Sequence, residues 1–408
     1  MRSGNWERPK ANGVLVASSF ANATAERPNA TIDYMLLSVV ITLTLLGVVM
    51  VYASTYHRGF QYLKWQFLRA ILGILALWVG TKLNIFRLAR PGVRLFLLLL
   101  TIGALIATLF FGELVGVTKR NILGAVQPAE FAKFVVIIWL AGYFAELNDS
   151  GDKPTFVNSF LKPGLVVMVI VMLTLLQPAV GTSFIIALSS GIMFIVAGVR
   201  WRYLFVAGVT VGLLIAIGSL MLPKLRDSKY RYIVERWDKF RTGDRYQQEQ
   251  ALIALGSGGP VGRGLGEGRQ KYYFLPKLHK DFIFCAIGEE MGFLGCFGVM
   301  VLYLIFFLRS LRIAKRTTSE FGQLLACGIG VVIILYAFVH QAVALSIIPT
   351  TGQPLPFISY GGSALMANLF GAGIVLKVSK YRRNGSEESV NRRGWHRWPY
   401  LSGARPRP

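Results

Sequence analysis

Ten largely apolar segments, each of roughly twenty residues, follow one another along this chain. A helix of about 20 apolar residues spans the roughly 30 Å hydrocarbon core of a bilayer, and lipid leaves unpaired backbone groups without partners. A transmembrane barrel would need short strands of alternating polarity, which are absent. We therefore expect an all-α integral membrane protein of about ten transmembrane helices, at residues 33–54, 61–81, 93–112, 128–146, 162–177, 180–199, 202–222, 282–308, 321–346 and 358–379.

Lysine and arginine divide the connecting loops into two groups. They are concentrated after the second span, after the eighth span and in the tail from Lys377 onward. Because cytoplasmic loops carry such an excess, these loops and both termini are expected inside. The predicted organisation is a cytoplasmic tail at 1–32, a ten-helix membrane domain at 33–380 and a basic cytoplasmic tail at 381–408. One large extracytoplasmic loop, 223–280, separates helices 7 and 8.

The strong positive charge does not indicate a nucleic-acid partner. The formal net charge is +24, but 54% of the residues are hydrophobic and only 16% are charged. The positive-inside bias accounts for such a balance in a membrane protein. The three cysteines lie in apolar runs without a C-x-x-C pair, so buried, unreactive thiols are expected rather than disulfides.

The stretch LHKDFIFCAIGEEMGF, 278–293, carries three carboxylates into an apolar run. Asp281 stands where the loop enters the membrane, so it is a candidate general base, or alternatively the N-cap of the following helix. Glu289 and Glu290 lie too far inside for caps. Intramembrane carboxylates need partners, and a buried hydrogen bond or ion pair is favoured for at least one of them over catalysis.

The large loop ends in a glycine-rich, basic stretch, GSGGPVGRGLGEGRQKYYFLPKLHKD at 256–281. A P-loop is excluded because no Gly-Lys-Ser/Thr follows the glycines. Glycines at alternate positions and several cations suit a phosphate or pyrophosphate group. The alternative is a flexible loop whose basic residues meet anionic lipid headgroups.

Two further stretches place polar residues at the mouths of spans. QPAEFAK at 127–133 sets Glu130 and Lys133 one turn apart, either as an ordinary i,i+3 pair or lining a polar cavity, and Lys64 and Arg69 in the second span are similar candidates. The last outer loop, PTTGQPLPFISYGGS, contains Ser359 and implies a rigid turn beside close helix packing. His340, alone on an apolar face, is expected to be a hydrogen-bonded interior histidine.

Together, QPAEFAK, QPAVGTS, the long stretch from ALGSGGPVGRGLGEG to EEMGFLG, and PTTGQPLPFISYGGS resemble, in this order, the SEDS family of FtsW, RodA and SpoVE. The resemblance covers 33–380 and is greater to the FtsW and SpoVE branch. It implies a peptidoglycan glycosyltransferase in the bacterial cytoplasmic membrane, acting in cell division at the septum. Such an enzyme polymerises lipid II and releases undecaprenyl pyrophosphate.

The same resemblance implies the partners and the roles of particular residues. The partners would be a class B penicillin-binding protein, other divisome membrane proteins and membrane lipid, and a divalent cation (Mg or Mn) would take part. Asp281 matches the catalytic aspartate of the family. The expected substrate or pyrophosphate contacts are Arg263, Arg269, Lys271, Lys277, His279, Ser257, Gly258 and Gln250. The expected cavity residues are Glu130, Lys133, Lys64, Arg69, Glu289, Glu290 and Ser359.

The chain also departs from the family pattern at Asn121, Ala179, Lys280 and His340. The resemblance therefore implies no binding role for the residues at these four positions. Two other functions are compatible with the residues. A flippase for lipid-linked precursors could use Lys64, Arg69, Glu289 and Glu290 as a polar path. An inactive division scaffold would fit the altered loop before Gln127. The specific motifs lie on the outer side, which favours the polymerase.

Overall fold

The computed structural model describes residues 31–115, 118–121, 126–150, 155–177, 179–203, 205, 208, 246–272 and 274–381. The predicted seventh span, the first part of the large loop and both tails lie outside these residues. The described elements are helices α2 (Tyr34–Thr55), α3 (Gln61–Lys82), α4 (Ile85–Ala89), α5 (Pro91–Phe111), α6 (Pro128–Asp149), α7 (Lys162–Leu176), α8 (Val180–Val196), α12 (Tyr246–Ser257), α13 (Leu278–Asp281), α14 (Ile283–Arg316), α15 (Glu320–Ala344) and α16 (Gly362–Val378), a 3-10 turn η1 (Tyr56–Arg58), a π-helical turn η2 (Val157–Leu161), and strands β1 (Glu113–Val115) and β2 (Thr118–Asn121).

Among the described residues, six helices are long and apolar enough to cross a membrane, and α8 and α16 are shorter apolar helices. The all-α membrane fold is therefore confirmed, while the count of ten spans stays a prediction. The described helix bounds agree with the predicted spans within a few residues, except that α14 continues to Arg316. Strands β1 and β2 form a small antiparallel hairpin that the sequence analysis did not predict.

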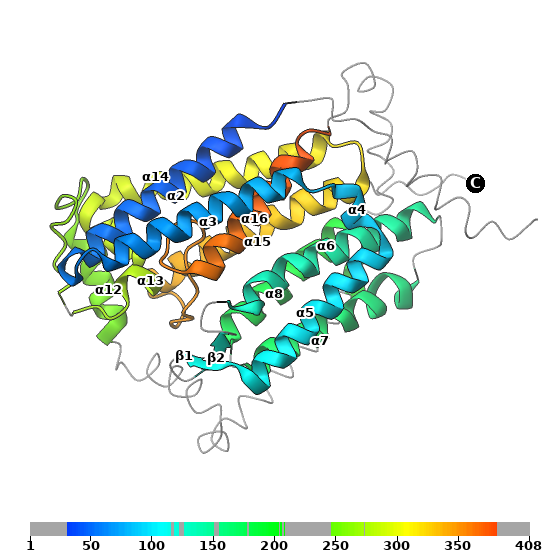
Figure 1. Cartoon of the computed structure of the whole chain (residues 1–408), viewed down its shortest axis with the longest axis horizontal. Helices are drawn as coiled ribbons and strands as arrows, with labels where there is room; N and C mark the ends of the chain where they lie inside the picture. The colour runs from blue at the N-terminus through cyan, green and yellow to red at the C-terminus, as the bar shows by residue number, and fades with distance from the viewer. Residues whose placement is uncertain are drawn as a thin grey trace, which may run out of the picture.

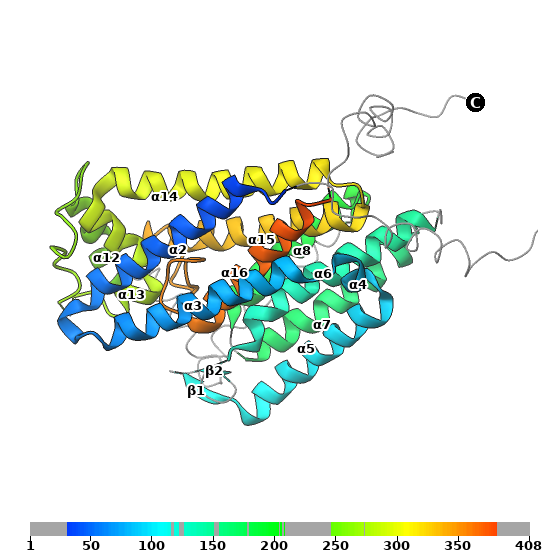
Figure 2. The same ribbon diagram turned by 45° about the horizontal axis from the view of Figure 1, so that its top comes forward.

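The helices form two neighbouring groups (Figures 1 and 2). Helices α2, α3, α14, α15 and α16 lie together, and α5, α6, α7 and α8 form the second group beside them. Glycines allow the closest approach, between α3 and α16. A Cβ on Gly80 would lie 3.0 Å from the Cα of Gly373, and a Cβ on Gly373 would lie 2.2 Å from the carbonyl oxygen of Leu77. Small residues of this kind drive helix association where lipid removes the hydrophobic difference.

The bundle has two chemically different ends. At one end, named here the terminal end, α2 begins and α16 stops: the Asp33 N–H donates to Ser379 Oγ, and Arg309 pairs with the Asp33 carboxylate. At the opposite end, named the loop end, lie η1, α12, α13 and the segment 346–361 (Figure 1). The placement of α2, α16 and the α14–α15 connection at one end agrees with the predicted loop grouping.

Helix α14 is interrupted near its start. Gly292 has φ 66° and ψ −163°, a conformation open to glycine, so the part carrying Glu289 and Glu290 is separate from the long part that follows. The glycine-rich loop fits into this break: Phe293 N–H donates to Gly259 O (2.8 Å) and Arg263 N–H donates to Glu289 O (3.0 Å). The predicted continuous span is thus a short helix and a long one joined at the loop end.

Candidate active site

Asp281 is the last residue of α13, the short helix that connects the glycine-rich loop to α14. Its side chain is half-buried, and its Oδ1 atom is buried without a hydrogen-bond partner among the described residues. Phe282 occupies the N-cap position of α14, and no side chain caps that helix. The N-cap alternative for Asp281 is therefore wrong, and its carboxylate is available for chemistry.

His279 fixes α13 to two other parts of the bundle. Its ring lies 5.2 Å from the Tyr62 ring and 5.3 Å from the Tyr360 ring, centroid to centroid. Its carbonyl oxygen accepts the Tyr360 N–H at 3.0 Å. Burial, reinforced by the positive charge of Arg58, lowers the pKa of the His279 imidazole to about 4. At neutral pH this ring is an uncharged spacer that positions the segment carrying Asp281.

His340 lies on α15 and is 1% exposed. Its Nδ1 is 2.8 Å from Gln353 O, and because a carbonyl only accepts, Nδ1 is the donor. The prediction of a hydrogen-bonded interior histidine is confirmed. In the neutral ring Nε2 then carries the lone pair, and it has no partner among the described residues. The Asp281 carboxylate is near enough to His340 to interact with it electrostatically.

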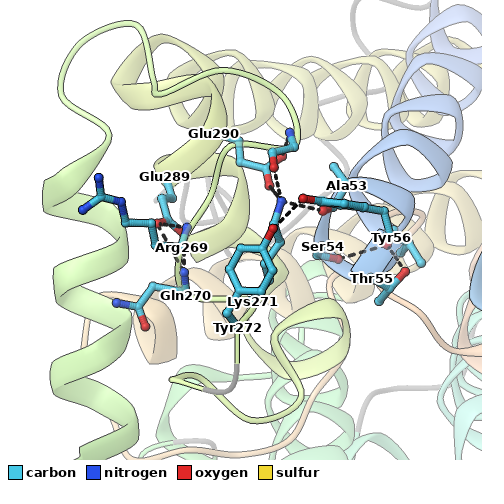
Figure 3. Close-up of polar contacts among 12 residues, drawn as sticks. Ala53, Ser54, Thr55, Tyr56, Arg269, Gln270, Lys271, Tyr272, Glu289 and Glu290 are labelled. Carbon is cyan, nitrogen blue, oxygen red and sulfur yellow. Dashed lines mark hydrogen bonds and ion pairs between the residues drawn. The ribbon is translucent and has the colours of Figure 1, made fainter. Parts of the chain in front are cut away.

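Glu289 and Glu290 hold the glycine-rich loop (Figure 3). The Glu289 carboxylate accepts the N–H groups of Arg269 (2.6 Å) and Gln270 (3.3 Å), and Glu290 accepts the Gly266 N–H at 3.0 Å. The prediction that at least one carboxylate has a structural hydrogen bond is confirmed for both. They were also expected to line a cavity; their oxygens instead face the loop backbone.

Lys271, one of the predicted pyrophosphate contacts, has a buried ammonium that other parts of the protein already bind. It is 3% exposed, and its ammonium pairs with Glu290 and donates to the carbonyls of Ala53 (3.2 Å) and Gly266. The ammonium also lies 4.3 Å from the centre of the Tyr56 ring. Ala53 of α2, Tyr56 of η1 and Glu290 therefore surround this ammonium (Figure 3), and a pyrophosphate contact at Lys271 stays a prediction.

The other predicted contacts in the loop differ in exposure. Arg263, Arg269 and Lys277 have exposed side chains, so their charges are available at the loop end. Arg263 Nε donates to Ser257 O at 3.1 Å, which steadies the guanidinium. Gly258 is buried and its carbonyl accepts the Gly262 N–H at 2.9 Å. The half-buried Gln250 lies on α12, and binding roles for all of these residues stay predictions.

The residues expected to line a cavity are dispersed. Glu130 and Lys133 form a buried ion pair, Oε2 to Nζ 2.7 Å, and the ammonium lies 3.8 Å from the centre of the Tyr336 ring. Ser359 is buried and its hydroxyl accepts the Leu355 N–H at 2.8 Å, so it shapes the outer turn. A cavity at these residues stays a prediction.

The two cavity candidates of the second predicted span, Lys64 and Arg69, differ in burial. Lys64 is exposed, whereas Arg69 is half-buried and stacks on Tyr360. Sequence reasoning did not single out Gln66, which is completely buried between them. A polar amide in an apolar span one turn from a cation was the signal that could have found it.

The described residues do not form a metal site by themselves. No group of three or more His, Cys, Asp or Glu side chains among them is placed to hold a metal ion. A single carboxylate, Asp281, with His340 in its neighbourhood does not supply the oxygen ligand set that Mg²⁺ usually takes. The described residues alone therefore do not supply a preformed site for the divalent cation that the resemblance implies, and that cation stays a prediction.

These features define a multi-pass membrane protein whose helical bundle presents a half-buried carboxylate at its loop end, with one oxygen that has no partner among the described residues. Residues 33–384 match the family of FtsW, RodA and SpoVE, described as cell cycle proteins. The chain belongs to this family.

Curated relatives and solved structures agree with this assignment. The chain is 33% identical over 361 residues to "Probable peptidoglycan glycosyltransferase FtsW" of Geobacter sulfurreducens, covering 85% of this chain and 95% of the relative. It is 31% identical to "Stage V sporulation protein E" of Bacillus subtilis, covering 85% and 97%.

Among solved structures, a chain from a study of "polymerization and crosslinking by a peptidoglycan synthase complex" matches with TM-score 0.71 and 25% identity, covering 86% of this chain and 99% of that one. The rod shape determining protein RodA of Thermus thermophilus matches with TM-score 0.64 and 26% identity, covering 86% and 98%. The fold is therefore that of RodA.

Proposed function

We propose that this protein is a peptidoglycan glycosyltransferase that polymerises lipid II into glycan strands during cell division and releases undecaprenyl pyrophosphate. The family, and the name of the relative from Geobacter sulfurreducens, support the activity. The observation that carries the proposal is the Asp281 carboxylate, whose buried Oδ1 has no partner among the described residues. Such an atom is available to a substrate hydroxyl.

The chemistry follows from the position of Asp281. The carboxylate takes the proton of the acceptor GlcNAc 4-hydroxyl while that oxygen attacks the anomeric carbon of the donor MurNAc. The bond from this carbon to the pyrophosphate oxygen breaks, and the pyrophosphate leaves with the electron pair. In this proposal the cations Arg263, Arg269 and Lys277, whose side chains are exposed, stabilise the charge that develops on it.

A flippase or an inactive scaffold has less support. The polar path of a flippase would use Glu289 and Glu290, yet both carboxylates are engaged by the backbone of the glycine-rich loop. A scaffold would not require a buried carboxylate without a partner, since such a group is costly to keep. Neither alternative accounts for Asp281.

We further propose a class B penicillin-binding protein, other divisome membrane proteins and membrane lipid as partners, with the protein at the septum of the cytoplasmic membrane and both termini cytoplasmic. The match to a chain from a peptidoglycan synthase complex supports a transpeptidase partner. The gathering of the α2 start and the α16 end at one end supports termini on the same side.

The test is polymerisation of labelled lipid II by the full-length protein with its cognate transpeptidase, comparing wild type with Asp281→Asn. Glycan strands from the wild type alone would establish the activity and the base. Glycan strands from both proteins would support the glycosyltransferase activity but exclude Asp281 as its general base. If neither makes strands while a known polymerase does so in the same mixture, the glycosyltransferase proposal fails.

A further inference from the structure

Arg69 is a cation on a membrane-spanning helix without a carboxylate partner among the described residues. Its guanidinium carbon lies 4.1 Å from the centre of the Tyr360 ring, and its Nη1 is buried with no described hydrogen-bond partner. The buried and half-buried ion pairs of the described residues use other cations, namely Arg94, Lys133, Lys271 and Arg309. Since charge within a span needs a counter-charge, Arg69 calls for an anion.

Gln66 adds a second unsatisfied group to the same helix face. It is 0% exposed, and neither its amide nitrogen nor its amide oxygen has a hydrogen-bond partner among the described residues. It lies four residues after Tyr62 and three before Arg69, so the three side chains share one face of α3. Tyr62 and Arg69 both contact Tyr360, so this face of α3 is turned toward the outer segment that contains Tyr360.

The amino end of α16 reaches this face. A Cβ on Gly362, the first residue of α16, would lie 3.2 Å from Arg69 Nε. No side chain caps the helix at Gly361. The first backbone N–H groups of a helix lack partners inside it and carry partial positive charge. A guanidinium therefore lies beside a helix amino end, with an unpaired amide one turn earlier on the same face of α3, an arrangement suited to a phosphate oxygen.

The location relative to Asp281 is specific. The Tyr360 ring lies between His279, two residues before Asp281, and Arg69. The backbone of Arg69 lies seven residues after Tyr62 on α3, about 10 Å further into the bundle at the α-helical rise. Its guanidinium reaches back to the Tyr360 ring, so it lies on the membrane side of the ring contact that His279 makes. In a donor whose sugar is joined to a lipid through pyrophosphate, the pyrophosphate lies on the membrane side of the reacting carbon.

We propose that Arg69, Gln66 and the amino end of α16 form an anion subsite that binds a phosphoryl group of the polyprenyl-pyrophosphate-linked substrate. The identity of this ligand rests on the proposed function. The group that such a subsite recognises is a phosphate oxygen at the membrane interface. Both the substrate and an anionic phospholipid headgroup carry such an oxygen. The subsite binds and orients the substrate, and it takes no part in bond making.

The test measures binding of farnesyl pyrophosphate to the full-length protein in phosphatidylcholine nanodiscs by microscale thermophoresis, with farnesol as the uncharged control. Arg69→Gln removes the cation, Arg69→Lys keeps a charge, and Gln66→Leu removes the amide. Lys82→Gln is the matched control, because it removes an exposed cation from the last turn of the same helix. A second set of nanodiscs contains phosphatidylglycerol as the competing headgroup.

We expect Arg69→Gln to weaken binding at least about tenfold, as for loss of a charge-assisted hydrogen bond. Lys82→Gln should change it less than about twofold, and phosphatidylglycerol should not compete. Wild-type affinity in Arg69→Gln would overturn the subsite. If phosphatidylglycerol displaces the probe from wild type but not from Arg69→Gln, the site binds a lipid headgroup, and its assignment to the substrate phosphoryl group is overturned.

Two controls separate folding and function from binding. If Arg69→Gln does not give a monodisperse protein, Gln66→Leu replaces it, with a loss of about threefold or more expected and an unchanged affinity overturning the subsite. Asp281→Asn should bind the probe like wild type while failing to polymerise lipid II. If the wild type binds the probe through Arg69 but makes no glycan strands, the proposed anion subsite is supported and the proposed glycosyltransferase activity is rejected.

Discussion

The ammonium of Lys271 lies 3.6 Å from Oε1 of Glu290, and the two side chains are 1% and 2% exposed. The pair joins the glycine-rich loop to the short helix before Gly292. Lys271 also donates to Ala53 O, so the same cation connects the loop to the end of α2. A loop that looks flexible in sequence is thus held on two sides, which gives its exposed arginines a rigid support.

Removing one member of this pair should strongly destabilise the loop. Lys271→Met leaves Glu290 buried without its cation, and breaking a buried pair costs about 3–5 kcal/mol. Glu290→Gln in the Lys271→Met background removes the uncompensated charge and should recover part of the loss. The three buried cysteines allow the unfolding temperature to be followed with a thiol-reactive dye.

The matched control for Lys271→Met is Arg263→Met, which removes an exposed cation from the same loop. It should leave the unfolding temperature close to that of wild type, because exposed charges contribute about 0–1 kcal/mol. Equal unfolding temperatures for Lys271→Met and Arg263→Met would contradict the structural role of the pair.

Gly262 should not tolerate alanine, whereas Gly259 should do so at a modest cost. Both have left-handed backbones, φ 90° and 58°. A Cβ on Gly262 would lie 2.3 Å from Glu290 O, while one on Gly259 meets nothing within 4 Å. Gly259→Ala therefore costs only the left-handed conformation, about 1–2 kcal/mol. Gly262→Ala must also displace the loop from α14.

The measurement compares unfolding temperature and lipid II polymerisation for the two glycine variants. We expect Gly262→Ala to lose both stability and strand synthesis, and Gly259→Ala to retain strand synthesis. Equal behaviour of the two variants would show that the break in α14 does not depend on close contact with the loop.

The membrane fold was predictable because length and hydropathy decide it locally. A run such as Tyr34–Thr55 needs no distant information to be recognised as a span. The same logic identified Glu289 and Glu290 as carboxylates that require partners. It could not supply the identity of those partners. The N–H groups of Gly266 and Arg269 lie 24 and 20 residues before the carboxylates that accept them, and only the folded loop brings them together.

Lys271 illustrates the limit most clearly. In sequence it is one of several cations in a glycine-rich loop and cannot be distinguished from Arg269. In the structure Lys271 is buried and Arg269 is exposed. The difference comes from the contacts of Lys271 with Tyr56 and Ala53, over 200 residues earlier in the chain. Patterns within one segment carry no information on such long-range packing.

The Glu130–Lys133 pair should contribute to stability more than an ordinary surface pair. Both side chains are at most 3% exposed, so Lys133→Met leaves a buried carboxylate and should cost about 3–5 kcal/mol. The control is Arg94→Met, which breaks a pair whose carboxylate partner, Glu146, is 26% exposed and can be rehydrated. Unfolding temperatures of the two variants provide the comparison. A smaller loss for Lys133→Met than for Arg94→Met would contradict the expectation.

His279 should remain neutral at pH values where an ordinary histidine is charged. Burial, with the charge of Arg58, lowers the pKa of its imidazole from 6.5 to about 4. Between these two values the unfolded chain binds a proton that the folded protein does not, so stability falls as pH is lowered from about 6.5 towards 4. The effect should disappear about one pH unit above the unfolded-state pKa of 6.5, where the unfolded chain also leaves this ring unprotonated.

The variant that isolates this effect is His279→Gln, in which the difference from wild type in unfolding temperature should change sign or shrink as pH falls from 7 to 5. The chain has four histidines, so NMR of protein labelled at the imidazole Cε1, with the His279→Gln spectrum as assignment, can follow the titration directly. A His279 resonance with a midpoint near 6.5 would show that the ring is not held dry between Tyr62 and Tyr360, and α13 would then not be a rigid support for Asp281.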